Sequence, residues 1–372
     1  MSDPRARALA FRRRLASALW PLALAPILLG AAVVDGTRPD ATSPRFPKGL
    51  AAPRLGPVAP GLEDWSQVRC ASCHADEARA WAQSGHATAR TNFVFQAALT
   101  ADDPTWCLRC HAPLARDLSA GPIDPNAPAE ERGVTCAACH AGHHAVTAAH
   151  ASADAPHALE VSPHAGGSKL CAQCHEFGFA LHGADGEISS LTAAPAQQDT
   201  FGEWTAWQAK TGDARGCLDC HGGGDHAFGG VRRPDALAAA IAVRPQPGAL
   251  VLEARGAGHA LPTGDVMRWL TVEAAADPLF EKPIVLARFG RTLGDAQAPG
   301  EASPHRTVTG DHRLQPGVPV RVALPLQDPP LIAWRLVMHL VSLQQEADGM
   351  LPAEASRVLL QSGYLANPEE KR

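Results

Sequence analysis

The 372-residue chain has no cysteine outside five short motifs, and after residue 34 it has no apolar run long enough to cross a membrane. The first absence leaves no spare thiol for lipidation, and the second excludes a transmembrane helix beyond the N-terminal segment. Positive charge is also scarce, since 33 Lys and Arg face 38 Asp and Glu and give a formal net charge of −5. A chain of this balance lacks the basic surface of a nucleic-acid-binding protein, so nucleic acid is excluded as a partner.

All ten cysteines lie in five copies of Cys-x-x-Cys-His. In this motif the two thiols can form thioethers with one haem, and the adjacent imidazole can take an axial position on its iron. The pattern therefore predicts five covalently bound haem c groups. The covalent ligands are Cys70, Cys73, Cys107, Cys110, Cys136, Cys139, Cys171, Cys174, Cys217 and Cys220, and the proximal iron ligands are His74, His111, His140, His175 and His221.

Two other uses of the cysteines stay open at this point. A lone Cys-x-x-Cys can be half of a zinc site or a redox dithiol. Ten cysteines in an exported protein can also form a disulfide framework. Neither alternative requires a histidine after every second cysteine, so haem attachment is the interpretation that the pattern favours.

The N-terminal segment predicts export from the cytoplasm. Five arginines at positions 5, 7, 12, 13 and 14 precede a nearly continuous apolar run over residues 15–34. This order is typical of a signal peptide, although the run is also long enough for an uncleaved membrane anchor. We expect a periplasmic or otherwise extracytoplasmic protein. Removal of residues 1–34 makes the formal net charge −9, which suits docking to basic patches on redox partners such as quinol oxidases or dehydrogenases, other cytochromes or terminal reductases.

Composition divides the remaining chain into three parts. Residues 35–62 are rich in Pro, Gly and Ala and are expected to form a tether. Residues 63–233 hold all five motifs, so the porphyrins must form much of the core of a mostly irregular and α-helical haem-packed domain. Residues 240–365 contain short runs of branched apolar residues between turn signals, which predict a C-terminal all-β, sandwich-like domain. The expected strands are 250–254, 269–274, 284–289, 318–324 and 335–343.

Two short helices are predicted in the haem region. Asp76 and Glu77 supply negative charge to the start of a helix that runs towards His86. Residues 203–211 form a second helical pattern, which Gly212 is placed to end. Four prolines within residues 112–132 predict a loop between the second and third motifs.

Twelve histidines outside the motifs are candidates for the second axial position of each iron. Methionine is the alternative ligand, but Met267, Met338 and Met350 all lie outside the haem region, which favours bis-histidine haems of low potential. We expect His305, His312 and His339 to be structural or exposed. The distal ligands predicted from position are His86, His144 (preferred to His143), His164, His226 and His259, with His150 and His182 in reserve.

The connecting residues resemble those of bacterial multihaem c-type cytochromes, especially the superfamily of the tetrahaem carrier linked to hydroxylamine oxidation. The shared pattern includes Trp81-x-x-Ser84-x-His86, residues 133–136 before the third motif, Trp207, and the element Gly258-His259-x-x-Pro262-Thr263-Gly264. The resemblance implies closely packed haems, with His86 and His259 on haems other than the nearest in sequence. A fifth haem and a β module depart from the tetrahaem pattern.

Three functions are compatible with these features. The favoured one is an electron carrier without catalytic residues of its own, because an iron with two protein ligands cannot bind a substrate. The second is a reductase or oxidase of a small nitrogen or sulfur compound at one open haem. Its support is weak. Some nitrite reductases have a lysine in place of the motif histidine at the catalytic haem, and hydroxylamine oxidoreductases use a tyrosine linked to it. Here no motif has that lysine, and the only tyrosine is Tyr364, near the C-terminus. The third is a subunit of an outer-membrane conduit or cytochrome filament.

Overall fold

The computed structural model describes residues 55–98, 104–118, 123–162, 165–184, 188–222, 225–230, 233–324 and 331–366. The predicted export segment and most of the predicted tether lie outside these ranges. No helix in the described ranges is both long and apolar enough to span a bilayer.

Four of the five cysteine motifs lie within a short helix, and the first starts in a helix that ends at Ala71, before Cys73 and His74. The helices concerned are α1 (Gln67–Ala71), α4 (Pro104–His111), α6 (Cys136–His140), α7 (Ser168–His175) and α9 (Cys217–His221). Because residues three apart share one face of a helix, this conformation turns both thiols of a motif in one direction. A helix therefore presents the two cysteines together, as attachment to one haem requires.

Both predicted helices of the haem region are present. The first is α2 (Ala75–Ala82), followed by the 3-10 turn η2 (His86–Thr88). The second is α8 (Thr200–Thr211), which ends at Gly212 in the left-handed conformation at φ 73°, as expected for a glycine that closes a helix. Two further short helices of this region are α3 (Phe93–Ala98) and α5 (Ala129–Arg132), while α10 (Pro234–Ala240) packs against strands of the C-terminal region.

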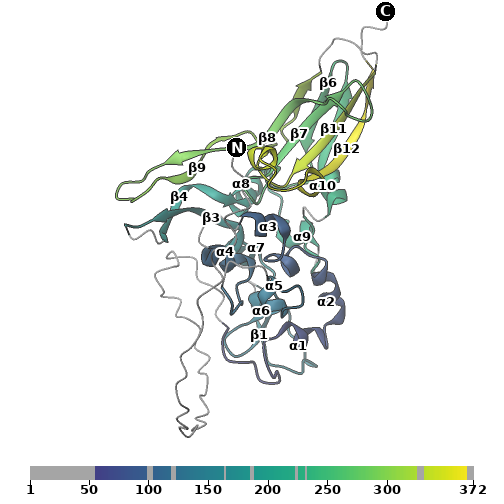
Figure 1. Cartoon of the computed structure of the whole chain (residues 1–372). Coiled ribbons are helices and arrows are strands. Elements are labelled where there is room, and N and C mark those ends of the chain that lie inside the picture. Colours follow the sequence, from purple (N-terminus) through teal and green to yellow (C-terminus); the bar gives the residue numbers. More distant parts are fainter. Residues whose placement is uncertain are drawn as a thin grey trace, which may run out of the picture. The chain divides into compact units, whose positions relative to one another are not determined.

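The haem region also contains two strand pairs that were not predicted. Strands β1 (Val146–Ala148) and β2 (Leu159–Val161) are parallel, and β3 (Glu176–His182) pairs with β4 (Ile188–Asp199) in an antiparallel hairpin. The hairpin begins directly after the fourth motif. It contacts β9 (His305–Asp311) of the C-terminal region, as Figure 1 shows.

The C-terminal region is a β domain of two antiparallel sheets, which confirms the predicted fold class. The larger sheet has the order β12 (Arg357–Ala366), β11 (Leu331–His339), β7 (Trp269–Ala275), β8 (Ile284–Ala296), β9. The smaller sheet has the order β10 (Val320–Ala323), β6 (Ala249–Ala254), β5 (Ile241–Gln246). The predicted strand 335–343 is wrong at its end, because β11 stops at His339 and Ser342 caps the helix α11 (Leu343–Ala347). A last short helix, α12 (Ala353–Ser356), precedes β12.

The apolar core is unevenly distributed. The β domain holds a large cluster of buried side chains, including Leu250, Leu252, Leu270, Leu314 and Leu336, none of which exposes any surface. The haem region holds a small cluster around Trp65. Part of the predicted tether joins this small cluster, because Ala59 is buried and the Trp65 indole donates to the carbonyl of Gly56 at 3.0 Å.

Candidate haem-binding site

The first and third motifs lie against each other. The side-chain oxygen of Gln67, on α1, accepts a hydrogen bond from the backbone N–H of Cys136 at 3.0 Å. The thiols of Cys70 and Cys136 also form a hydrogen bond, which raises the pKa of Cys70 and lowers that of Cys136 to about 7. Two cysteine pairs that are distant in sequence are thus presented side by side.

The fourth motif lies between the second and the fifth. Ser168, at the start of α7, accepts a hydrogen bond from the N–H of Cys217 at 3.0 Å. On the other side, Cys174 forms a hydrogen bond with Cys110. The indole of Trp106 packs edge-on against Phe177 with ring centroids 5.4 Å apart. The motifs therefore contact each other in the pairs one–three, two–four and four–five.

Four of the five motif histidines face a second imidazole. The ring centroids are 6.0–6.4 Å apart in the pairs His74–His157, His175–His86, His140–His226 and His221–His259. One metal ion bound to a nitrogen of each ring at about 2 Å separates the two centroids by roughly 6 Å. The spacing of these side chains thus fits an iron held between each pair.

The second motif is the exception. Its histidine, His111, stacks on Phe95 with centroids 3.8 Å apart and an interplanar angle of 9°. No second imidazole faces it within the part of the chain that the structure describes. The ring is nevertheless oriented like the others, because its Nδ1 hydrogen-bonds to the carbonyl of Ala89 at 3.0 Å.

Hydrogen bonds at Nδ1 leave Nε2 available as the metal ligand. The Nδ1 atoms of His140, His221 and His259 bond to the carbonyls of Thr147, Gly229 and Ala260. Such bonds fix both the tautomer and the direction of a ligand imidazole. Nδ1 of His175 instead accepts from the side-chain amide nitrogen of Gln198 at 2.7 Å, a contact that orients the ring without placing a proton on Nδ1.

Burial keeps these rings neutral, which is the form that binds a metal. It lowers the pKa of His175 and of His259 to about 4, with smaller effects from neighbouring histidines and arginines. It also lowers the pKa of His86, His111 and His140. At neutral pH these imidazoles therefore need not lose a proton to act as ligands.

The residues around His86 explain why the Trp-x-x-Ser-x-His pattern and the glycine at 133 occur together. The Trp81 indole donates to the carbonyl of Val134 at 2.8 Å, and Ser84 accepts from the N–H of Ala87 at 3.3 Å. The N–H of Val134 in turn donates to the carbonyl of His86 at 2.9 Å. A Cβ on Gly133 would collide with that carbonyl, so only glycine lets the two segments approach this closely.

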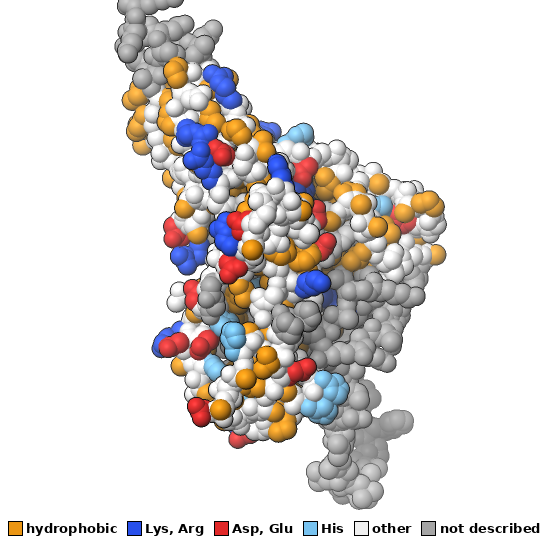
Figure 2. All heavy atoms as spheres, turned by 180° about the vertical axis from the view of Figure 1, so that it is seen from behind, with side chains coloured by type: hydrophobic (Ala, Val, Ile, Leu, Met, Phe, Trp, Pro, Cys, Tyr) orange, Lys and Arg blue, Asp and Glu red, His pale blue; other side chains and the backbone are white. Residues whose placement is uncertain are grey.

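The predicted distal ligands fall into three groups. His86, His226 and His259 each face a motif histidine. For His86 and His226 this is not the nearest motif before them, whereas His259 faces His221 of the nearest motif, so the expectation that it serves another haem is wrong. His144 instead packs edge-on against its exposed neighbour His143 at 4.5 Å. His164 lies outside the described residues. Figure 2 shows histidine side chains at the surface of the haem region.

One partner was missed by the sequence analysis. His157 faces His74, and it is held by Gly61, whose Cβ position lies 2.8 Å from the Cα of His157. No local motif surrounds it that could have singled it out. The reserves are not paired in this way, since His150 is exposed and His182 ends β3.

The histidines of the β domain have other partners. His305 forms an ion pair with Glu301 at 2.8 Å, and His339 lies buried between Glu346 and Thr271 at 2.6 and 2.9 Å. No two of the ten cysteines form a disulfide, and the described residues contain no cluster of three or more His, Cys, Asp or Glu side chains that could hold a metal ion.

The fold and the five motifs are similar to those of multihaem c-type cytochromes. Residues 69–141 match the family of cytochrome c554 and c-prime. The fold is similar to the crystal structure of a penta-heme cytochrome c552 from Thermochromatium tepidum, with a TM-score of 0.55 and 22% identity over 81% of this chain and 98% of that chain. At this identity the likeness establishes the fold. No curated protein matches the chain in sequence.

Replacement of Gly133 by alanine tests the packing around His86. The added methyl group has to displace the η2 turn, and we expect a loss of about 1–3 kcal/mol in the free energy of unfolding, as for other overpacked sites. The low-spin signal of the haem that His86 serves should change in electron paramagnetic resonance (EPR). Gly230→Ala is the control, because no atom lies within 4 Å of its Cβ position. Equal behaviour of the two variants would contradict this account of Gly133.

Proposed function

We propose that the chain holds five haem c groups and carries electrons between partner proteins outside the cytoplasm. Each bound haem supplies a one-electron Fe(III)/Fe(II) couple. The observation that carries the proposal is the set of four imidazole pairs at 6.0–6.4 Å, each of which includes one motif histidine. Two imidazoles on one iron fill both axial positions, so such a site favours electron transfer over substrate binding.

The contacts between motifs support a continuous path. The cysteines of motifs one and three, two and four, and four and five touch through hydrogen bonds. Motifs three and four are also close enough for the charge of Cys174 to raise the pKa of Cys139, to which burial contributes most. Haems attached to these cysteines are therefore held at short separations along the order one, three, four, five, with the second beside the fourth.

Two histidine ligands on one iron favour a low reduction potential. Methionine ligation raises the potential of a haem, and the described imidazole pairs leave no position for it on four of the five haems. Partners with basic patches around their own redox centres suit the net acidic chain, because opposite charges accelerate encounter without requiring a tight complex.

A second function is favoured by the environment of His111. Among the described residues no imidazole lies opposite this ring, while Phe95 covers one of its faces. A haem held here would keep one axial position for a small ligand, as in a reductase of a nitrogen or sulfur compound. Its neighbour, the fourth motif, would connect that position to the carrier path.

The numbers of low-spin and high-spin haems per chain distinguish the two functions. We expect the pyridine haemochrome assay to give five haems per chain, and EPR of the oxidised protein to show four low-spin haems and one high-spin haem. Nitrite, or cyanide at a concentration too low to displace an axial histidine, should convert the high-spin signal alone. Five low-spin haems would reject the reductase and retain the carrier, whereas two or more high-spin haems would contradict the ligation proposed here.

A pair of variants tests the first haem. His157→Ala should remove one low-spin signal, because His157 faces His74 at 6.4 Å. His144→Ala is the matched control, since this histidine is exposed and faces only His143. Loss of a low-spin signal in His144→Ala, with none in His157→Ala, would overturn the assignment. The haem count should stay the same in both variants.

The location is tested on the natural precursor. The apolar run of residues 15–34 with arginines before it supports export, and covalent haem attachment in bacteria is expected outside the cytoplasm. Fractionation of producing cells should place the haem-stained protein outside the cytoplasm, and N-terminal sequencing should show whether the segment is removed. Holoprotein in the cytoplasmic fraction would reject the proposed location.

A further inference from the structure

We propose that Glu203 and Trp207 are positioning residues that set the orientation of His259 towards His221. The inference rests on the proposed ligation of the fifth haem by these two histidines. The segment concerned is residues 258–263 of the β domain, which contacts helix α8 through Thr200, Glu203 and Trp207.

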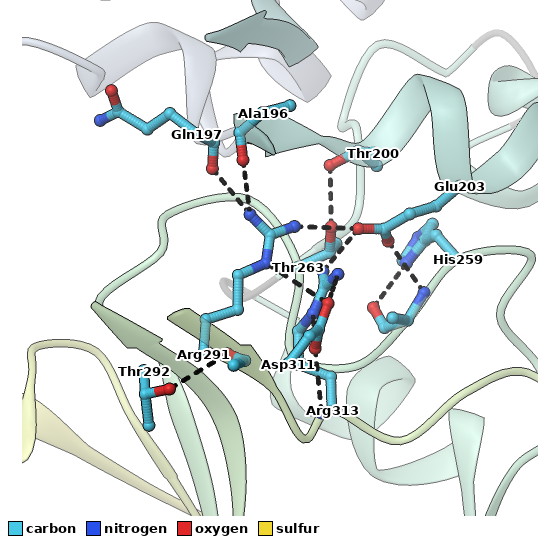
Figure 3. A network of polar contacts seen from close by, with 12 residues as sticks. Ala196, Gln197, Thr200, Glu203, His259, Thr263, Arg291, Thr292, Asp311 and Arg313 are labelled. Atoms are coloured by element: carbon cyan, nitrogen blue, oxygen red, sulfur yellow. Dashed lines mark hydrogen bonds and ion pairs between the residues drawn. The ribbon is translucent and has the colours of Figure 1, made fainter. Parts of the chain in front are cut away.

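One face of α8 holds this segment on both sides of His259. Thr200, Glu203 and Trp207 are spaced by three and four residues, and therefore lie along the same face of the helix. The hydroxyls of Thr200 and Thr263 are 2.8 Å apart, and Glu203 Oε2 accepts from the N–H of Ala260 at 3.0 Å. Figure 3 shows these groups converging from the helix and the loop.

The third contact is steric. The indole of Trp207 lies against Gly258, where a Cβ would be 2.8 Å from Cε3 and 3.1 Å from Cζ3 of the ring. Real Cβ contacts are not this short, so the segment can rest on Trp207 only because residue 258 is glycine. Its backbone does not adopt the left-handed conformation, which means that the glycine is required for space.

The carboxylate of Glu203 is itself held in place. Its Oε1 accepts from Arg291 at 3.0 Å and lies 2.6 Å from Arg313 Nη1, and the two arginine side chains are only 5% and 6% exposed. Arg291 also donates to the carbonyls of Ala196 and Gln197, and Arg313 pairs with Asp311. In this arrangement one oxygen of Glu203 is fixed by the arginines and the other by Ala260.

The path from Glu203 to the imidazole passes through one residue. Ala260 donates its N–H to Glu203, and its carbonyl hydrogen-bonds to Nδ1 of His259 at 3.2 Å. The orientation of the His259 ring therefore depends on the position of Ala260, whose N–H is held by the Glu203 carboxylate. The result is a ring that lies 14° from parallel with His221, whereas the other three pairs are tilted by 37–59°.

This near-parallel arrangement gives the fifth haem its own spectroscopic marker. The angle between the two imidazole planes controls the splitting of the iron d orbitals, so that near-parallel rings give a rhombic low-spin EPR signal. More strongly tilted rings move the largest g value upwards. Rotation of the His259 ring should therefore change the EPR signal of the fifth haem and leave the signals of the other four haems unchanged.

Two independent variants test the proposal on the holoprotein. In Glu203→Gln the amide cannot accept from both Ala260 and the arginines, and in Gly258→Ala the methyl group meets Trp207. Both should raise the largest g value of the rhombic signal, and cyanide should displace His259 at a concentration lower by about tenfold or more, the effect of losing a hydrogen bond to a charged group. Glu203→Asp should recover part of the wild-type signal.

Glu253→Gln is the matched control. Glu253, on β6, also accepts from two arginines, Arg244 and Arg255, at 2.8 and 3.1 Å, and makes none of the described contacts to residues 258–263. Its replacement should leave the rhombic signal and the cyanide titration unchanged. A shift of the same size in Glu253→Gln and Glu203→Gln would overturn the proposal, because general loosening of the β domain would then explain both.

His259→Ala separates the two levels of inference. If this variant keeps all its low-spin signals, the proposed ligation of the fifth haem is wrong. If it loses the rhombic signal, added imidazole restores it, and Glu203→Gln and Gly258→Ala behave like wild type, then the ligation stands and the positioning role is rejected. Loss in His259→Ala together with shifts in both other variants supports the proposal.

Discussion

The haem region depends on imidazole pairs that join segments far apart in the chain. Its own apolar core is a small cluster around Trp65, whereas the β domain buries Leu250, Leu270, Leu336 and many others. On the proposed ligation, each pair closes a long loop of chain through one iron. Metal binding of this kind contributes directly to the free energy of folding, because the unfolded chain offers no preformed site. Stabilisation of the fold by bound haems would therefore explain both the small apolar core of the haem region and its high density of motifs.

Backbone groups position several of the paired histidines. The carbonyls of Thr147, Gly229 and Ala260 fix the rings of His140, His221 and His259, while the carbonyl of His86 itself bonds to Val134. These contacts satisfy polar groups that would otherwise be buried without partners. Two glycines are required for this packing. Gly133 lets its backbone approach the carbonyl of His86, and Gly258 lets its backbone approach the indole ring of Trp207.

Local sequence signals predicted local structure, whereas features that depend on tertiary packing were not predicted. Helix α2, helix α8 with Gly212, and strands β6, β7 and β8 follow from acidic residues at a helix start, capping and branched apolar residues, whereas the helices of the motifs were not predicted. Strands β4 and β9 were missed because they carry Ser, Thr, Ala and Gly and are held by their neighbours β3 and β8. For the same reason His157 could not be chosen over His144, since its pairing with His74 arises from chain packing and not from any motif around it.

The β domain contributes to more than one motif of the haem region. Besides presenting His259, the same connection between β6 and β7 carries Asp265 and Arg268, whose charges act on His111. Burial lowers the pKa of His111 most, the carboxylate of Asp265 opposes this effect, and the guanidinium of Arg268 adds to it. Arg268 also lowers the pKa of His175, after burial and His86. One connection of the β domain thus acts on His111, on His175 of the fourth motif and, through His259, on His221 of the fifth motif, so the charges around His111 and the position of His259 are set by the same segment.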